Sequence, residues 1–213
     1  MSFLKRLFGT DDGRGEDIRP ENLGRHLRDL ERKAEEAPLG TGWTFLNRAG
    51  DVCVRVGDTV RAVAYFGRAI DVLLEDEQPE PARGVAKKLI RVHPEAIRTL
   101  CTLTWLDLAA RQPAAAVLSL GEYAKAALQA GKEDLAADQV YTMARLTRDK
   151  AFLQEAVEVL AELDAESYAK KVEEWLKEGG SEEAKGDPDA LVRYCLTAAT
   201  GSQTLKKAGE SLE

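Results

Sequence analysis

The sequence predicts an all-α protein made of short antiparallel helices that pack as successive hairpins. From residue 20 to about residue 180, apolar residues recur every three or four positions, which is the period of an amphipathic helix. Turn signals rich in glycine, proline and aspartate separate these stretches into units of helix length. Aromatic residues make up only 6% of the chain, so small aliphatic side chains are expected at the helix contacts.

The composition limits the classes of partner and the location. A chain of 213 residues with 44% hydrophobic residues can bury a substantial core. The net charge is −7, and the expected helical part has no concentrated basic face, so nucleic acid is not a predicted partner. No apolar run reaches the ~20 residues of a membrane-spanning helix, and the start lacks the apolar core of a secretory signal. These features predict a cytoplasmic protein.

The three cysteines indicate a reducing compartment and no metal site. Cys53, Cys101 and Cys195 lie far apart in apolar contexts and do not form a CxxC motif. They are expected to be buried free thiols, and neither a metal nor a cofactor is predicted.

Residues 1–19 form the first predicted segment, an amphipathic stretch followed by a glycine- and aspartate-rich linker. On a helical wheel, one side of the stretch is apolar and the other basic, and the residues are Phe3, Leu4, Lys5, Arg6, Leu7 and Phe8. One interpretation is a reversible anchor that makes weak, peripheral contact with a membrane surface or enters a partner's groove. The other is a disordered tail whose apolar residues dock on the body of the protein.

Residues 20–180 are predicted to be the helical repeat domain. A helix opens at Pro20 and ends before Pro38. The next helix covers residues 42–56, and Gly57 is expected to end it in the left-handed conformation. Asp58 is expected to cap the helix that follows, over residues 59–75.

Five further helices are expected after the polar break at residues 75–81, and a sixth closes the array. Pro94 and Pro113 are each placed at a first helical position, while Asp149 and Asp164 are expected to be caps. The helices are predicted over residues 82–92, 95–111, 114–130, 132–147, 150–163 and 165–178.

Residues 181–213 are predicted to be a polar spacer and a last helix. Asp187 and Pro188 give a start signal for this helix, and Gly201 a stop signal. One interpretation is that the helix caps the exposed end of the array. The other is that the helix binds a partner or a neighbouring copy of the chain. Binding to a neighbouring copy would make the protein a homo-oligomer.

Residues 47–69 carry the clearest sign of a repeat. Small residues occur where two antiparallel helices would touch, and Phe66 fills the space beside them. The tetratricopeptide signature has a tryptophan, a leucine-glycine pair and a tyrosine on its first helix, then AxxxF and a closing proline on its second. This chain has Gly50, Ala62, Phe66 and Ala69 at the matching positions, and Leu46, Ala49, Cys53 and Leu74 at the positions that depart from the signature.

The segment over residues 42–75 therefore resembles a tetratricopeptide repeat, and later hairpins resemble it only in outline. The resemblance implies a TPR-like α-solenoid, a right-handed superhelical array of antiparallel helix hairpins. In that family, the first helices of successive repeats line a concave groove that binds a peptide, a helix or another protein. It implies that the groove-facing row of this chain is Thr44, Asn47, Asp51, Val54 and Arg55.

The residue types in this row bear on the ligand. Asn47, Asp51 and Arg55 are four apart and project from one helix face, where they suit an extended backbone or a charged side chain. Family members that bind chaperone tails use a lysine followed four residues later by an asparagine. An aspartate at the second position would repel a terminal carboxylate, so a chaperone tail is not predicted. An ordinary solvated helix face remains the alternative for this row.

Motifs for common catalytic chemistries do not occur. The sequence contains no HExxH, GxSxG or GxxxxGK[ST] motif, and its two histidines, His26 and His93, lie in contexts that favour capping or exposure. The sequence therefore predicts a non-enzymatic interaction module, an adaptor, scaffold, assembly factor or complex subunit. Two alternatives are a membrane-recruited or self-assembling structural protein and a helical enzyme that uses His93.

Overall fold

The computed structural model describes residues 20–187, 190–191 and 194–195, and the regular structure in these ranges is entirely helical. The predicted all-α class is confirmed for this part of the chain. The helices are α2 (Pro20–Glu36), α3 (Trp43–Val56), α4 (Thr59–Glu75), α5 (Pro79–Val92), α6 (Ile97–Ala109), α7 (Pro113–Gln129), α8 (Glu133–Leu146), α9 (Lys150–Glu162), α10 (Glu166–Glu178) and α11 (Glu182–Gly186).

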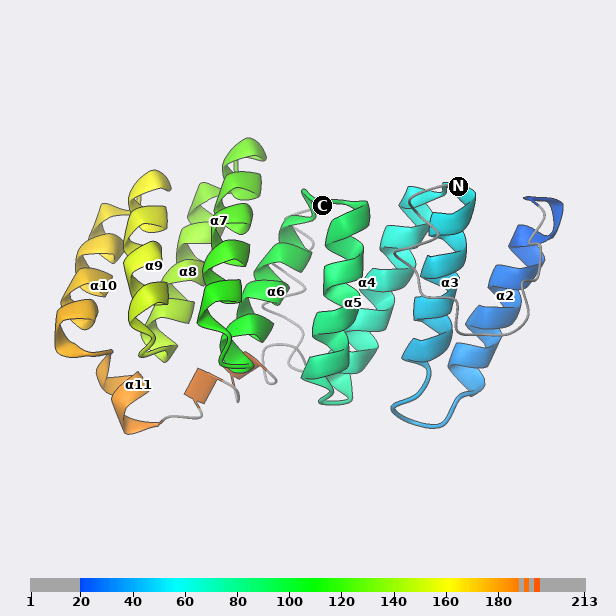
Figure 1. Ribbon diagram of the computed structural model, residues 1–213, viewed down its shortest axis with the longest axis horizontal. Coiled ribbons are helices and arrows are strands. Elements are labelled where there is room, and N and C mark those ends of the chain that lie inside the picture. Colours follow the sequence, from blue (N-terminus) through cyan, green and yellow to red (C-terminus); the bar gives the residue numbers. More distant parts are fainter. Residues whose placement is uncertain (1–19, 188–189, 192–193, 196–213) are drawn as a thin grey trace.

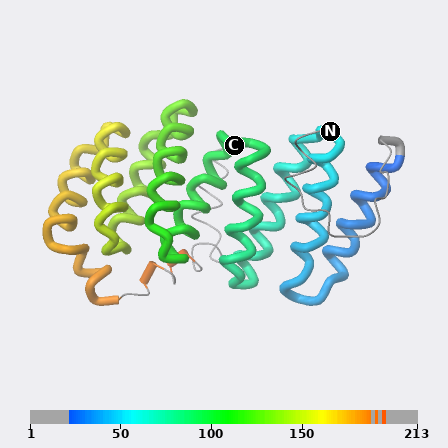
Figure 2. The backbone as a smooth tube through the Cα atoms, in the orientation of Figure 1, coloured from blue at the N-terminus to red at the C-terminus, as the bar shows by residue number. Residues whose placement is uncertain are grey.

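Helices α3 to α10 lie side by side in two rows. Each packs on the next helix in the sequence, and Figure 1 shows α3, α5, α7 and α9 in a front row with α4, α6, α8 and α10 behind them. The colour gradient in Figure 2 moves steadily along the molecule, so neighbours in space are mostly neighbours in sequence. Polar pairs also connect helices of the same row, as between Arg98 of α6 and Asp71 of α4. Front row and back row are used below in this sense.

The turn between α3 and α4 forms as the sequence predicts. Gly57 ends α3 with φ of 82°, in the left-handed region that glycine adopts without a steric penalty. Asp58 then caps α4, because its Oδ1 accepts a hydrogen bond from the backbone N–H of Arg61 at 3.0 Å. Both residues act locally, so their spacing in the sequence is sufficient to predict the turn.

The α3–α4 hairpin packs through small residues and one aromatic ring. Ala49, Ala62 and Ala69 are fully buried, and the ring of Phe66 is also fully buried. A Cβ atom added to Gly50 would lie 2.5 Å from Cε1 of Phe66. The helix backbones therefore approach closely where the sequence places its small residues.

Three predicted helix starts differ from the structure. The helix expected at residue 82 begins at Pro79, which takes the first helical position. Pro94 does not open a helix, because α6 begins only at Ile97 and a turn intervenes. Asp164 does not cap α10, since its φ is +57° and Ala165 is the N-cap residue. Asp149 does cap α9, accepting from the backbone N–H of Phe152 at 2.9 Å.

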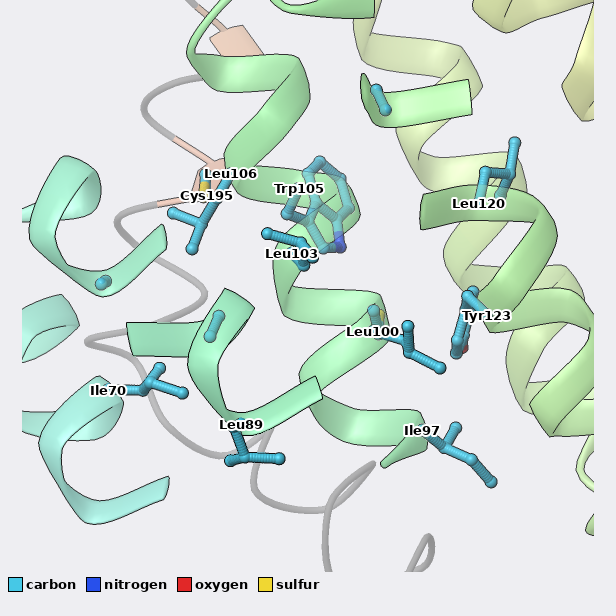
Figure 3. Close-up of a cluster of buried hydrophobic side chains, with 14 of the residues drawn as sticks. Ile70, Leu89, Ile97, Leu100, Leu103, Trp105, Leu106, Leu120, Tyr123 and Cys195 are labelled. Carbon is cyan, nitrogen blue, oxygen red and sulfur yellow. The ribbon is translucent and has the colours of Figure 1, made fainter. Parts of the chain in front are cut away.

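Helix α6 lies at the centre of the core. Every residue from Thr99 to Leu108 is buried, including three threonines and Asp107. Figure 3 shows the apolar cluster that α6 forms with neighbouring helices, with Leu100 and Ile97 near Tyr123 of α7 and Leu89 near Ile70. Trp105 is buried here, as its apolar surroundings predict.

A charged network holds α5, α6 and α7 together inside this core. The carboxylate of Asp107 pairs with the guanidinium of Arg83, and it accepts a hydrogen bond from Ser119 Oγ at 3.4 Å. Arg83 also donates to the side-chain oxygen of Gln112 in the α6–α7 turn. The side chain of Asp107 is only 2% exposed and that of Arg83 12%, so each compensates a charge that is largely removed from water.

The chain turns back on itself after α10. Helix α11 packs on α8, and Ser181 Oγ donates to the backbone carbonyl of Arg145. The described residues beyond it contact α6 in the middle of the array, where the ring of Tyr194 stacks on Trp105 at a centroid distance of 5.0 Å. Of the predicted last helix, these are the residues that the structure describes; the rest of it, Gly201 included, lies outside the described residues, so its two predicted roles stay predictions.

Candidate functional site

The five predicted groove residues all lie on α3, in the front row. Thr44 and Arg55 are exposed, whereas Asn47, Asp51 and Val54 are half-buried. Val54 packs against the hydrophobic core, so it contributes support more than contact area. The Thr44 hydroxyl donates to the backbone carbonyl of Thr41, in the turn that precedes α3, at 2.8 Å.

Lys88 of α5 connects two of these residues to the next helix of the front row. Its ammonium group lies 3.1 Å from Asn47 Oδ1 and 2.9 Å from Asp51 Oδ2. The same group lies 5.8 Å from the centroid of the Phe66 ring, within cation–π range. Lys88 thus compensates the Asp51 carboxylate, an effect that the sequence interpretation missed.

The compensation changes the electrostatic interpretation of the row. Asp51 was expected to repel an anionic ligand, but here its charge is paired with a cation that is itself 30% exposed. Arg48 and Arg55 on the same helix are exposed. The α3 and α5 part of the front row therefore presents more positive than negative side chains. The only sign of the Lys88–Asp51 pair in the sequence is that the two residues have opposite charges. Charged residues occur on most helices of this chain, so the sequence does not indicate which of them pair.

An apolar side chain is exposed on α7, another helix of the front row. Leu118 is 73% exposed. The front row thus combines polar and basic residues on α3 and α5 with an apolar one on α7.

The predicted anchor residues lie outside the described residues. These residues are Phe3, Leu4, Lys5, Arg6, Leu7 and Phe8. Among the described residues, none of the helices combines the length and the apolar character that crossing a bilayer requires.

The titratable groups that could support chemistry are either buried or isolated. Burial raises the pKa of both Cys101 and Cys195 to about 12, so these thiols stay protonated at neutral pH. Desolvation also raises the pKa of Cys53. His93 is exposed in the turn between α5 and α6. In the part of the chain that the structure describes, no three His, Cys, Asp or Glu side chains are grouped to hold a metal ion.

Comparison of the chain with protein-family models, with curated proteins and with solved structures finds no match.

Proposed function

We propose that this protein is a non-enzymatic interaction module, an adaptor, assembly factor or subunit of a complex. Its helix hairpins form a TPR-like array, and the front row of helices lines the groove that binds a peptide, a helix or a protein. The binding residues are Thr44, Asn47, Asp51 and Arg55, with Lys88 added from α5 and Val54 behind them. The buried thiols are in line with a cytoplasmic location.

The single observation that carries this proposal is the Lys88 contact between α3 and α5. Lys88 joins Asn47 and Asp51 of one hairpin to the next hairpin, at 3.0 Å from Asp51 Oδ1. Polar side chains of α3 and α5, which are neighbours in the front row, then form one continuous surface. A groove that extends across several hairpins requires such a surface. The mixture of amide, carboxylate and ammonium groups suits an extended peptide backbone with charged side chains.

The test is affinity co-purification with quantitative mass spectrometry, in which wild-type chain is compared with a front-row variant. Arg55→Glu reverses one exposed charge of the row. Arg25→Glu is the matched control, because Arg25 is an exposed arginine on α2. We expect Arg55→Glu to reduce recovery of the partner at least tenfold, and Arg25→Glu to leave it unchanged.

Two outcomes would contradict the proposal. One is a wild-type chain that purifies as a solitary monomer without a partner at cellular concentration. The other is a partner whose recovery Arg55→Glu and Arg25→Glu reduce equally, since this would locate binding away from the front row.

The amphipathic sequence of residues 1–8 favours a second candidate function, recruitment to a membrane as a self-assembling structural protein. Flotation with anionic liposomes tests it on the full chain. We expect the charge-reversing substitutions Lys5→Glu and Arg6→Glu to abolish flotation if the segment is an anchor. Equal flotation of both proteins would exclude this function.

A further inference from the structure

Helices α3 and α5 of the front row carry far more positive than negative side chains. Together they contain six arginine or lysine residues, whereas Asp51 and Glu80 are their only carboxylates. One of the six cations, Arg83, pairs with the buried Asp107 and belongs to the core network. The other five are Arg48, Arg55, Lys87, Lys88 and Arg91. Since the whole chain has a net charge of −7, this excess is a local feature of the front row.

Three of these cations have no carboxylate partner. Arg48, Arg55 and Arg91 are exposed, and none of them forms an ion pair with another residue that the structure describes. The two arginines of α4 in the back row, Arg61 and Arg68, are both paired with acidic side chains. Cations without such a partner are available to the negative charges of a ligand.

The cations lie close together along the two helices. Arg48, Asp51 and Arg55 are spaced by three and four residues, so they share one face of α3. Lys88 contacts Asp51 at 2.9 Å, and α3 and α5 run in the same direction because short turns connect both to α4. Arg55 and Arg91 therefore lie about one helical turn beyond this contact, on neighbouring helices of the row. Arg48 lies about one turn before it, so positive side chains border the contact on both sides.

The carboxylates nearby do not neutralise this group. Asp51 is already paired, and Glu80 lies 3.8 Å from Arg83 in the first turn of α5. Lys87 is 42% exposed and lies 3.9 Å from the carboxylate of Asp107, which Arg83 also pairs. The surface of α3 and α5 is therefore net positive and attracts a negatively charged ligand.

The positive surface ends before α9. That helix lies in the same row and contains three glutamates and one basic residue, which are Glu155, Glu158, Glu162 and Lys150. Helix α7, between α5 and α9, contains one acidic and one basic residue. A nucleic acid that followed the row would meet the carboxylates of α9, whereas a short segment over α3 and α5 would not. The distribution of charge thus favours a short acidic peptide segment over nucleic acid.

We propose that the ligand of the front-row groove is an extended, acidic segment of a partner protein, whose carboxylates bind the arginines of α3 and α5. This assignment rests on the proposed function, because both concern the same groove. Arg48 and Arg55 are about 10 Å apart along the helix axis, and side chains on one side of an extended chain repeat about every 7 Å. Two acidic residues at alternate positions can therefore reach Arg48 and Arg55, with Arg91 contacting the second from α5. Guanidinium groups suit this role, since they bind carboxylates through two parallel hydrogen bonds.

The test is fluorescence anisotropy of the full chain with a short labelled peptide in which glutamate alternates with threonine. Both termini are blocked, so a terminal carboxylate does not contribute. The comparison peptide has glutamine in place of glutamate, which keeps the shape and removes the charge. At about 50 mM salt, we expect the glutamate peptide to bind at least tenfold more tightly than the glutamine peptide. Raising the salt to about 200 mM should weaken this binding at least fivefold, because exposed charges are screened.

Three variants and one control locate the binding. Arg48→Glu and Arg91→Glu should each weaken binding of the glutamate peptide at least fivefold. Lys171→Glu is the control and should leave it unchanged, because Lys171 is an exposed cation of α10 at the opposite end of the array. Asp51→Asn should strengthen binding at least threefold, since it removes the only carboxylate of α3 and releases Lys88. A damaged fold does not produce such a gain.

Five results would overturn the proposal. The first two are no measurable binding of the glutamate peptide and equal binding of the glutamate and glutamine peptides. The third is a loss of binding in Lys171→Glu as large as that in Arg48→Glu. The fourth is weaker binding in Asp51→Asn. The fifth is a labelled single-stranded oligonucleotide of equal charge that binds more tightly than the glutamate peptide, since this would identify nucleic acid as the ligand.

Failure of this inference is distinguishable from failure of the proposed function. If the glutamate peptide does not bind but co-purification recovers a partner that Arg55→Glu loses, the groove binds a ligand of another chemistry. In that case the acidic ligand is excluded and the interaction module stands.

Discussion

The ring of Phe66 lies directly against the backbone of Gly50. A Cβ atom at position 50 would come within 2.5 Å, 2.6 Å and 2.9 Å of three ring carbons, closer than real Cβ contacts allow. The ring is fully buried and belongs to the opposite helix of the hairpin, so neither group can move without disturbing the core.

We therefore expect Gly50→Ala to destabilise the protein by about 1–3 kcal/mol, the usual effect of overpacking a core. Gly84→Ala is the control, because Gly84 is an exposed glycine inside α5 with nothing near its Cβ position. It should stabilise the protein by about 0.5–1 kcal/mol, since alanine is the better helix former. Urea unfolding measures both. Equal unfolding midpoints for the two variants would refute the close-approach explanation.

Removing Asp107 should be far more costly than removing an aspartate near the surface. Asp107→Ala removes the buried carboxylate that pairs with Arg83 and leaves this nearly buried cation with Gln112 and the more distant, exposed Glu80, so we expect a loss of up to about 3–5 kcal/mol. Asp71→Ala, which removes the half-exposed partner of Arg98, should cost about 1 kcal/mol or less. Chemical denaturation of both variants checks this. A similar, small loss for both would mean that water reaches the buried pair.

The buried thiols should make stability fall at alkaline pH. Burial raises the pKa of Cys101 to about 12, whereas an unfolded thiol loses its proton near pH 8.5. Above this value the unfolded state binds fewer protons than the folded state, so the free energy of unfolding decreases as the pH rises toward 12. Because Cys101→Ala lacks this titration, the stability difference between wild type and variant should narrow between about pH 8 and pH 10. A constant difference would contradict the prediction.

Lys88 and Asp51 should be energetically coupled across α3 and α5. Both side chains are about one-third exposed, so a double-mutant cycle with Lys88→Ala and Asp51→Ala should give a coupling of about 0.5–1 kcal/mol. The coupling should decrease at high salt, because these partly exposed charges are screened. Additive single-variant effects at low salt would show that the contact does not hold the two hairpins together.

Local signals made much of the helix pattern predictable. Gly57 and Asp58 act within one turn of their own positions, as does Asp149 at the start of α9. The predicted first residue of a helix was wrong where a neighbouring residue begins or caps the helix instead. Pro79 opens α5 although the sequence interpretation started that helix at residue 82, and Asp164 takes a left-handed φ of +57° where a cap was expected.

Contacts between distant residues could not be predicted in the same way. The Lys88 contact with Asp51 joins two helices, and each residue alone matches an ordinary solvated helix face. The C-terminal contact with Trp105 had one indirect signal, the apolar residues all round α6, which imply a covering element without identifying it. The membrane anchor and the handedness of the array stay predictions.

The stacking of Tyr194 on Trp105 also bears on how the chain folds. Helices that contact mainly elements one or two places away in the sequence have low contact order and can fold and fray one hairpin at a time. The returning segment closes a long loop that contains α7, α8, α9 and α10. These four helices should consequently open together in native-state hydrogen exchange, with one shared free energy, while α2 and α3 open independently at the other end.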